Sequence, residues 1–255
     1  MISNRNFETY RDQKVYANLI GTMDTWVKLN ASSAGKDKLI RVLQYTLKVV
    51  NHYHQQRQTN AGTLQSWKQL EGSLSSFRKL LRMGKSVEVL RGTSRTIRLS
   101  DPVYRVTLTI GRIAQSMFLF ADHLLWLSRA GVISIDVKKW EQIFYRCWLY
   151  SITMNLCRDV YDLWRAAELY AEHGMPPAPR RRLLPELRAR PLALILDRHR
   201  DLAVDFVKNA FDLMLPLAAL GHVPLSSGAV GVCGVVSSAL ALWTVVDPSL
   251  TLRPS

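Results

Sequence analysis

The sequence predicts an all-α fold, that of a helical membrane protein with amphipathic N-terminal helices and one or two transmembrane helices. Three observations lead to this prediction. The chain holds no segment of any length with the two-residue alternation that is typical of a half-buried strand. The 24 residues of segment 223–246 include no ionisable side chain except the thiol of Cys233. The stretch 73–90 places apolar side chains and cationic side chains on opposite arcs of a helical wheel.

The charge of the chain is strongly positive and unevenly distributed. The formal net charge of the 255 residues is +14. Residues 1–101 hold 17 Lys and Arg against 7 Asp and Glu, whereas residues 129–222 hold 14 against 11. A basic surplus suits an acidic partner surface, either lipid headgroups or nucleic acid. Because the chain has no nucleic-acid recognition motif and does have an uncharged segment, we expect no nucleic-acid partner.

The N-terminal part divides into an extension and a basic helical region. Residues 1–22 hold no apolar run long enough for a signal peptide, and we expect them to be loosely ordered. The basic amphipathic helical region is placed at residues 23–100. Its first long helix is expected to begin near Asn30 or Ser33, either of which can cap it, and to end near His54.

The strongest membrane signal of this region is the amphipathic helix expected over residues 73–90. Such a helix can lie in a membrane interface, with its apolar stripe at the acyl boundary and its cations at the headgroup phosphates. An ordinary surface helix docked on a protein core is the alternative. The almost wholly positive polar arc favours the membrane, because a solvated face usually mixes signs. The predicted membrane-inserting residues are Leu74, Phe77, Leu80, Leu81 and Val87, and the predicted anionic-lipid-binding residues are Arg78, Lys79, Arg82 and Lys85.

Residues 101–172 are predicted to be a helical membrane-associated region that starts after a break at Asp101-Pro102. Segment 103–127 is apolar but contains charges. Each lone charge costs about 2.5–3.5 kcal/mol at mid-bilayer, so a spanning helix must turn Arg112 and Asp122 towards protein or water. For segment 103–127 the sequence does not decide between a helix that spans the membrane and a helix that lies in the interface or packs in a bundle. The aromatic helix over 140–170 indicates a packing surface.

A linker and a C-terminal membrane span complete the organisation. Residues 173–191 contain five prolines and five arginines, a density that neither helices nor strands tolerate. Region 192–255 is expected to hold a helix over 192–220 and then the uncharged segment. As a helix, that segment is about 36 Å long, enough to cross a hydrocarbon core of about 30 Å.

Small residues recur every four positions in the uncharged segment. Such a row lets two helix backbones approach closely, so it predicts either self-association or packing within the chain. A buried helix of a soluble protein is the alternative, which the three glycines of the segment disfavour. The predicted helix-packing residues are Ala229, Gly231, Cys233, Ser237 and Ala241.

Motifs for catalysis are absent from the sequence. It has no phosphate-binding glycine loop, no His-Glu-x-x-His and no Gly-x-Ser-x-Gly. The three cysteines are too few and too widely spaced for zinc or a disulfide framework. Asp205, Lys208, Asn209 and Asp212 form either a polar constellation or ordinary helix-surface pairs. We therefore predict no catalytic residue, no metal site, no cofactor and no enzymatic activity.

Five blocks of the chain carry a resemblance to a known family. They are MDTWVKLNASSAGKDKLIRVLQY from Met23, SSFRKLLRMGKS at 75–86, WEQIFYRCWLYSITMNLCRDVYDLW at 140–164, DFVKNAFDLMLPLAALG at 205–221 and GAVGVCGVVSSALAL at 228–242. In these blocks, which occur in the family's order, the chain resembles the peroxisomal membrane protein 11 family. The resemblance covers 23–254 and leaves 1–22 outside.

The resemblance implies a protein of the peroxisomal membrane, with both termini in the cytosol, that elongates peroxisomes and promotes their division and proliferation. It implies an amphipathic helix inserted in the cytosolic leaflet of an anionic phospholipid membrane, and self-association into a homo-oligomer. A tail-anchored fission adaptor, a dynamin-like GTPase and a peroxisomal membrane-protein import receptor are the implied partners. A channel for small metabolites is the alternative function, which Arg105, Arg112 and Asp122 within segment 103–127 favour.

Overall fold

The fold consists of α-helices and one short 3-10 helix. A computed structural model describes residues 23–27, 29–57, 61–173, 195 and 198–252. None of these residues lies in a β-strand. The predicted all-α fold is therefore confirmed.

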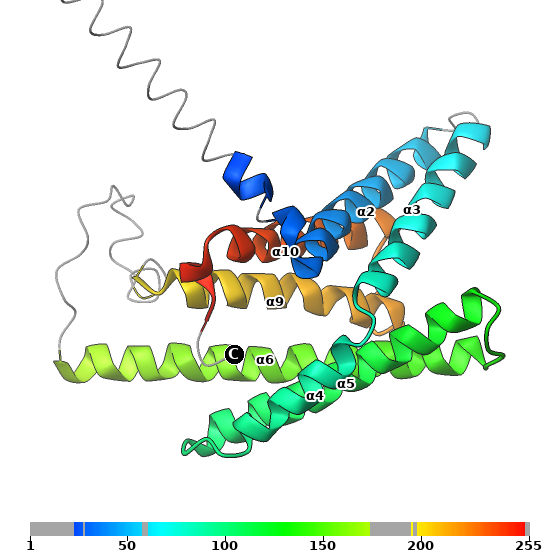
Figure 1. Ribbon diagram of the computed structural model, residues 1–255. Coiled ribbons are helices and arrows are strands. Elements are labelled where there is room, and N and C mark those ends of the chain that lie inside the picture. Colours follow the sequence, from blue (N-terminus) through cyan, green and yellow to red (C-terminus); the bar gives the residue numbers. More distant parts are fainter. Residues whose placement is uncertain (1–22, 28, 58–60, 174–194, 196–197, 253–255) are drawn as a thin grey trace, which may run out of the picture.

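Seven long helices pack side by side (Figure 1). Helix α5 packs along α6 and α4 along α5, while α9 lies between α6 and α10, and α2 packs against α10. The elements are α2 (Ser33–Gln56), α3 (Ala61–Leu81), α4 (Lys85–Thr96), α5 (Pro102–Arg129), α6 (Val137–His173), α9 (Arg200–Ala219), α10 (Ser227–Val246) and the 3-10 helix η1 (Pro248–Leu250).

Side-chain caps begin the helices near the predicted places. The Ser32 hydroxyl accepts a hydrogen bond from the backbone N–H of Gly35 at 2.9 Å, so the cap of α2 is neither Asn30 nor Ser33. Helix α2 ends two residues beyond the expected His54. The Asp101 carboxylate caps α5 through the N–H groups of Val103 and Tyr104, and Pro102 occupies the first turn as expected at this break.

The single helix expected over residues 73–90 is wrong. Helix α3 ends at Leu81, and α4 begins at Lys85 after a short turn. Gly84 has a φ of 78°, a left-handed conformation that glycine adopts without the steric cost of a Cβ. The single helical wheel therefore combines residues of two helices and the turn between them.

The helices of the C-terminal half differ from prediction mainly at their ends. Helix α6 is three residues longer at each end than the predicted 140–170. It includes His173, which we assigned to the linker 173–191, and the rest of that linker lies outside the described residues, as does the extension 1–22. The helix expected over 192–220 is described from Arg200 to Ala219.

The aromatic residues of α6 form part of the contact with α5. The ring centroids of Phe118 on α5 and Phe144 on α6 lie 5.6 Å apart in an edge-to-face arrangement. Trp148 lies 5.9 Å from Phe144, and the Arg41 guanidinium of α2 lies 5.9 Å from the Trp148 ring. These aromatics are a packing surface, as the sequence indicates, although Tyr150 and Trp164 of the same helix are exposed.

The distribution of polar and apolar side chains is the reverse of that in a typical soluble protein. Among the largest fully buried side chains are Asp122, Asp159, Ser237 and Ser238. Apolar side chains on α5 are in contrast 44–51% exposed, and they recur at helical spacing: Val106, Ile110, Ile113, Met117 and Phe120. A polar interior with apolar rows outside suits a lipid surrounding.

Of the described helices, only α10 is long and apolar enough to cross a membrane. Within its most apolar 18-residue window, 28% of the residues are buried in the protein, and the others are half-buried or exposed. Helix α5 is continuous through the ambiguous segment 103–127, and its Asp122 faces the protein interior.

Candidate membrane-contact surface

An outward-facing apolar row runs along α3 and α4. The exposed fractions of its side chains range from 44% at Leu80 to 69% at Val87. We call this set the α3–α4 apolar row: Phe77, Leu80, Met83, Val87, Leu90 and Ile97. Three of the five residues predicted to insert into a membrane belong to it, and the other two, Leu74 and Leu81, are half-buried.

The predicted lipid-binding cations of α3 point into the protein. Arg78 is 8% exposed; its Nε donates a hydrogen bond to Asp37 at 3.0 Å, and its Nη1 donates one to Gln44 at 2.8 Å. The Asp122 carboxylate of α5 pairs with the Lys79 ammonium at 2.9 Å and with the Arg82 guanidinium at 2.5 Å.

These contacts join α3 to its neighbours. Arg78 links α3 to α2 through Asp37, whereas Lys79 links α3 to α5 through Asp122. Lys85, the fourth predicted cation, is half-buried at the start of α4. It lines a partly open cavity between the helices that is described below. Binding of these cations to anionic lipid stays a prediction; in this arrangement Arg78, Lys79 and Arg82, the last in the turn after α3, share the carboxylates of Asp37 and Asp122.

A different set of cations lies beside the apolar row. Arg91, Arg95 and Arg98 are exposed on and just after α4. At 100° per residue they occupy the arc next to Val87 and Leu90. An apolar arc bordered by arginines is the arrangement of a helix that lies in a membrane interface.

Hydroxyl groups fill the contact between α4 and α5. The Ser116 hydroxyl donates a hydrogen bond to the Ser86 carbonyl at 2.8 Å, and the hydroxyls of Thr96 and Thr109 lie 3.0 Å apart. These small polar side chains let the two helices approach closely, as in helix pairs within membranes. The inner face of α4 is therefore polar, which leaves its apolar side chains on the outside.

The small residues of α10 pack against α2. A Cβ on Gly234 would lie 2.2 Å from the Tyr45 ring, and one on Gly231 would lie 3.1 Å from the Val49 backbone nitrogen. Of the predicted packing residues, Gly231, Ser237 and Ala241 are buried, while Ala229 and Cys233 are half-buried. The row thus contributes to a contact within the chain.

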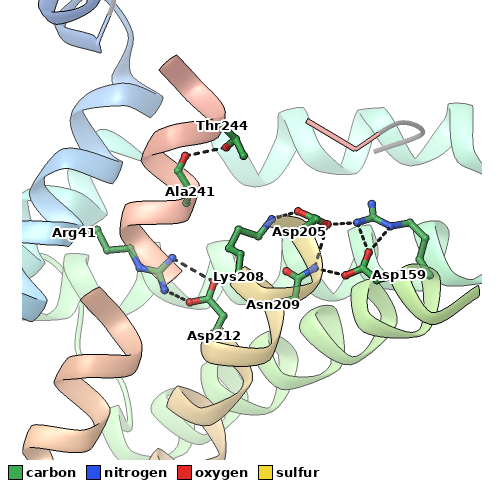
Figure 2. Close-up of polar contacts among 9 residues, drawn as sticks. Arg41, Asp159, Asp205, Lys208, Asn209, Asp212, Ala241 and Thr244 are labelled. Carbon is green, nitrogen blue, oxygen red and sulfur yellow. Dashed lines mark hydrogen bonds and ion pairs between the residues drawn. The ribbon is translucent and has the colours of Figure 1, made fainter. Parts of the chain in front are cut away.

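A buried polar network connects α6, α9 and α2 (Figure 2). Arg158 of α6 pairs with Asp159 and with Asp205 of α9, and Asn209 donates a hydrogen bond to Asp159 at 2.8 Å. One turn further along α9, Asp212 accepts a hydrogen bond from Arg41 of α2 at 2.5 Å. The polar residues of α9 are thus a constellation directed inwards, which decides between the two interpretations that the sequence leaves open.

The charges in this network stabilise one another. Burial opposes ionisation of Asp205, but Lys208 and Arg158 outweigh it and lower the pKa of this carboxyl group. Within the described part of the chain, no three His, Cys, Asp or Glu side chains are arranged to hold a metal ion. The network therefore acts as a structural set of ion pairs.

Comparison with known proteins identifies the family. A family model described as Peroxisomal biogenesis factor 11 (PEX11) matches residues 23–246. The chain belongs to the PEX11 family. The match covers every α-helix that Figure 1 labels, from α2 to α10, and ends before the 3-10 helix η1.

Individual PEX11 relatives match over almost the same length. Peroxisomal membrane protein 11B of Bos taurus is 34% identical over 258 residues, covering 91% of this chain and 100% of the relative. Peroxisomal membrane protein 11A of the same organism is 28% identical over 91% of this chain and 99% of the relative. Peroxisomal membrane protein PMP30B of Candida boidinii is 24% identical over 85% of this chain and 91% of the relative. No solved structure matches.

Two groups of candidate residues in this PEX11 chain escape the sequence analysis. One is the set of exposed arginines on and just after α4. A helix assigned to residues 73–90 ends before these arginines, whereas α4 begins anew after Gly84 and includes Arg91 and Arg95. The other is Gly228 and Gly234, which pack on α2 together with Gly231. Their three-residue spacing is visible in the sequence, but glycine rows alone do not name their partner helix.

Proposed function

We propose that this PEX11 protein is a non-enzymatic protein of the peroxisomal membrane that binds and curves the membrane through the α3–α4 apolar row. By this activity it elongates peroxisomes and promotes their division and proliferation, with both termini in the cytosol. The relatives named peroxisomal membrane protein 11A and 11B support the location. The outward direction of the apolar row, bordered by arginines, is the observation that carries the proposal.

The mechanism follows from shallow insertion into one leaflet. Side chains such as Phe77 and Leu80 each contribute about 1.5–3 kcal/mol when fully buried, and less at an interface. Arg91, Arg95 and Arg98 add about 1 kcal/mol each near an anionic surface, an attraction that salt weakens. Because the row enters only the cytosolic leaflet, it expands that leaflet and favours positive curvature.

Assembly on the membrane belongs to the same proposal. Self-association into a homo-oligomer would concentrate the inserted rows. A tail-anchored fission adaptor and a dynamin-like GTPase would then act on the narrowed membrane, and an import receptor for peroxisomal membrane proteins would deliver the chain. These partners rest on the family resemblance alone.

Full-length protein reconstituted with anionic liposomes tests the curvature proposal. We expect the wild type to convert vesicles into tubules, visible by electron microscopy. The variant Leu80→Glu/Val87→Glu should bind but no longer tubulate, since charged side chains cannot enter the acyl boundary. The matched control Gln55→Glu/Gln65→Glu adds the same two charges to exposed positions of α2 and α3 that lie outside the apolar arc, and it removes no apolar side chain. Unchanged tubulation by the Leu80/Val87 variant would refute the insertion.

A metabolite channel is the second candidate function, and two partly open cavities between the helices favour it. The first cavity has a volume of about 1040 Å³, and the second a volume of about 680 Å³. Arg112 lines the first and Asp122 the second, whereas Arg105 lines neither. In planar bilayers, Arg112→Glu should change the ion selectivity of a channel and the control Arg105→Glu should not. Absence of conductance in the reconstituted oligomer would count against this function.

A further inference from the structure

The two cavities, both partly open to the surface, adjoin at a set of residues from five helices. Each of α2, α5, α6, α9 and α10 provides one side chain that lines both cavities. We call this set the five-helix junction: Lys38, Gln115, Asn155, Lys208 and Thr244. Figure 2 shows two of these residues, Lys208 of α9 and Thr244 of α10.

The junction has an excess of positive charge. Six cationic and two acidic side chains line the first cavity. Lys208 pairs with Asp205, but none of the ion pairs among the described residues includes Lys38. The charges nearest to Lys38 are mostly of its own sign: Lys208, Lys85 and Arg41 oppose its ionisation, and only Asp37 favours it.

Burial and these neighbouring charges disfavour the protonated form of Lys38. Burial first, and then the charges of Lys208 and Lys85, lower the pKa of Lys38 to about 8. At pH 7 the group is still mainly protonated, so a half-buried cation without a carboxylate partner lies where the two cavities adjoin. A bound anion would supply the missing partner.

Neutral hydrogen-bond donors accompany the lysines. Gln115 of α5 and Asn155 of α6 are half-buried, and no hydrogen bond within the described part of the chain uses their side-chain amides. The Thr244 hydroxyl donates to the Ala241 carbonyl and can accept one further bond. Two ammonium groups and two free amide NH₂ groups, converging from four helices, match the acceptor oxygens of a phosphate or carboxylate.

We propose that the five-helix junction is a binding site for a phosphate- or carboxylate-bearing dianion, with Lys38 as its principal contact. The first cavity has a volume typical of sites for drug-sized molecules, so the anionic group can belong to a larger organic solute or to a lipid headgroup. The site is independent of membrane curvature, because none of its residues lies in the α3–α4 apolar row. It also needs no conduction through the membrane.

The test uses the full-length protein in nanodiscs of phosphatidylcholine, with inorganic phosphate as the probe. Calorimetric titration at pH 7 should show saturable binding. Lys38→Met should weaken the affinity by at least about tenfold, the value of one charge-assisted hydrogen bond. The control Lys36→Met removes an exposed lysine two residues away on the same helix and should leave the affinity unchanged. Lys38→Met should fold well, since it removes a buried cation without a carboxylate partner.

A second variant and a pH series make the assignment to the junction specific. Gln115→Met keeps the side-chain length but removes the amide and should also weaken binding. With sulfate as the probe, which stays a dianion throughout, raising the pH from 7 to 9 should weaken binding to the wild type as Lys38 loses its proton, and should have much less effect on Lys38→Met. Equal affinities for the wild type and Lys38→Met, or no saturable binding of any anion, would overturn the proposal.

The source of the anion is decided by a second arm of the experiment. Nanodiscs that contain phosphatidic acid present the same phosphate group as a lipid headgroup. If the headgroup occupies the junction, phosphatidic acid should raise the melting temperature of the wild type but not of Lys38→Met, and it should displace inorganic phosphate. If only free phosphate produces the Lys38-dependent shift, the ligand is a soluble anion. Vesicle tubulation should be unaffected by Lys38→Met in either case, which separates this site from the proposed curvature mechanism.

Discussion

The Asp122 carboxylate draws the cationic side chains of Lys79 and Arg82 towards the protein interior. It is fully buried and pairs with both Lys79 and Arg82. Its position on α5 would be costly in a lipid-exposed helix, but the two cations supply the partners that a buried charge requires. One carboxylate therefore holds two cations of another helix away from the surface.

We predict that Asp122→Asn strongly destabilises the protein. The substitution leaves Lys79 without its counter-charge and Arg82 with Asp37 alone, and removing one partner of a buried ion pair typically costs about 3–5 kcal/mol. Thermal unfolding in detergent micelles measures the effect as a lower melting temperature. The control Glu168→Gln neutralises an exposed carboxylate of α6 and should change stability by less than about 0.5 kcal/mol. A melting temperature of Asp122→Asn equal to that of the wild type would show that the ion pairs are not needed for folding.

At the scale of helices, close packing of α10 on α2 explains the glycine-rich sequence of the predicted span. Gly228, Gly231 and Gly234 would each bring an added Cβ into contact with α2. Glycine lowers the propensity of a helix to form in water, but in a membrane span it allows the backbones to approach. The same residues that weaken an isolated helix therefore position α10.

We predict opposite effects for the same substitution at two helical glycines. Gly234→Ala places a methyl group against the Tyr45 ring and should destabilise the protein by about 1–3 kcal/mol, despite the better helix propensity of alanine. Gly72→Ala, in the middle of α3, meets no atom within 4 Å and should stabilise by about 0.5–1 kcal/mol. Melting temperatures of the two variants in the same detergent give the comparison. If Gly234→Ala were as stable as Gly72→Ala, the close contact of α10 with α2 would be wrong.

Across the whole molecule, charged and hydroxyl groups gather inside while apolar rows face outwards on α3, α4, α5 and α10. This arrangement lets a protein with a net charge of +14 present apolar side chains to lipid. In the proposed membrane-bound state, the exposed arginines of α4 would lie at the level of the headgroups. Burial of ion pairs between helices and exposure of apolar side chains are two aspects of one adaptation to a lipid surrounding.

We predict that α10 anchors the whole protein in the membrane. Val232 is 50% exposed in this helix, and Val232→Lys would place a charge within the hydrocarbon core at a cost of about 2.5–3.5 kcal/mol. Extraction of membranes with alkaline carbonate should then release more of this variant than of the wild type. Val246→Lys, at the end of the same helix, is the control, because a lysine there can reach the headgroups. Equal retention of both variants would mean that α10 does not span.

The sequence by itself determined the helical fold, the approximate limits of most helices, the uncharged span and the family. These properties depend on local information: apolar spacing, capping residues, the length of an uncharged run and short blocks of residues. The same local patterns identified three residues of the exposed apolar row and three buried residues of α10.

Only the tertiary structure decided which arc of the α3 wheel faces the protein. A wheel separates apolar from cationic side chains, but it does not say which arc is inside, and in lipid the usual assignment reverses. The decision lies with Asp37 and Asp122, which are 41 residues from Arg78 and 40 residues from Arg82 respectively. Their carboxylates are brought next to α3 only when α2 and α5 pack against it, and buried cations require such partners.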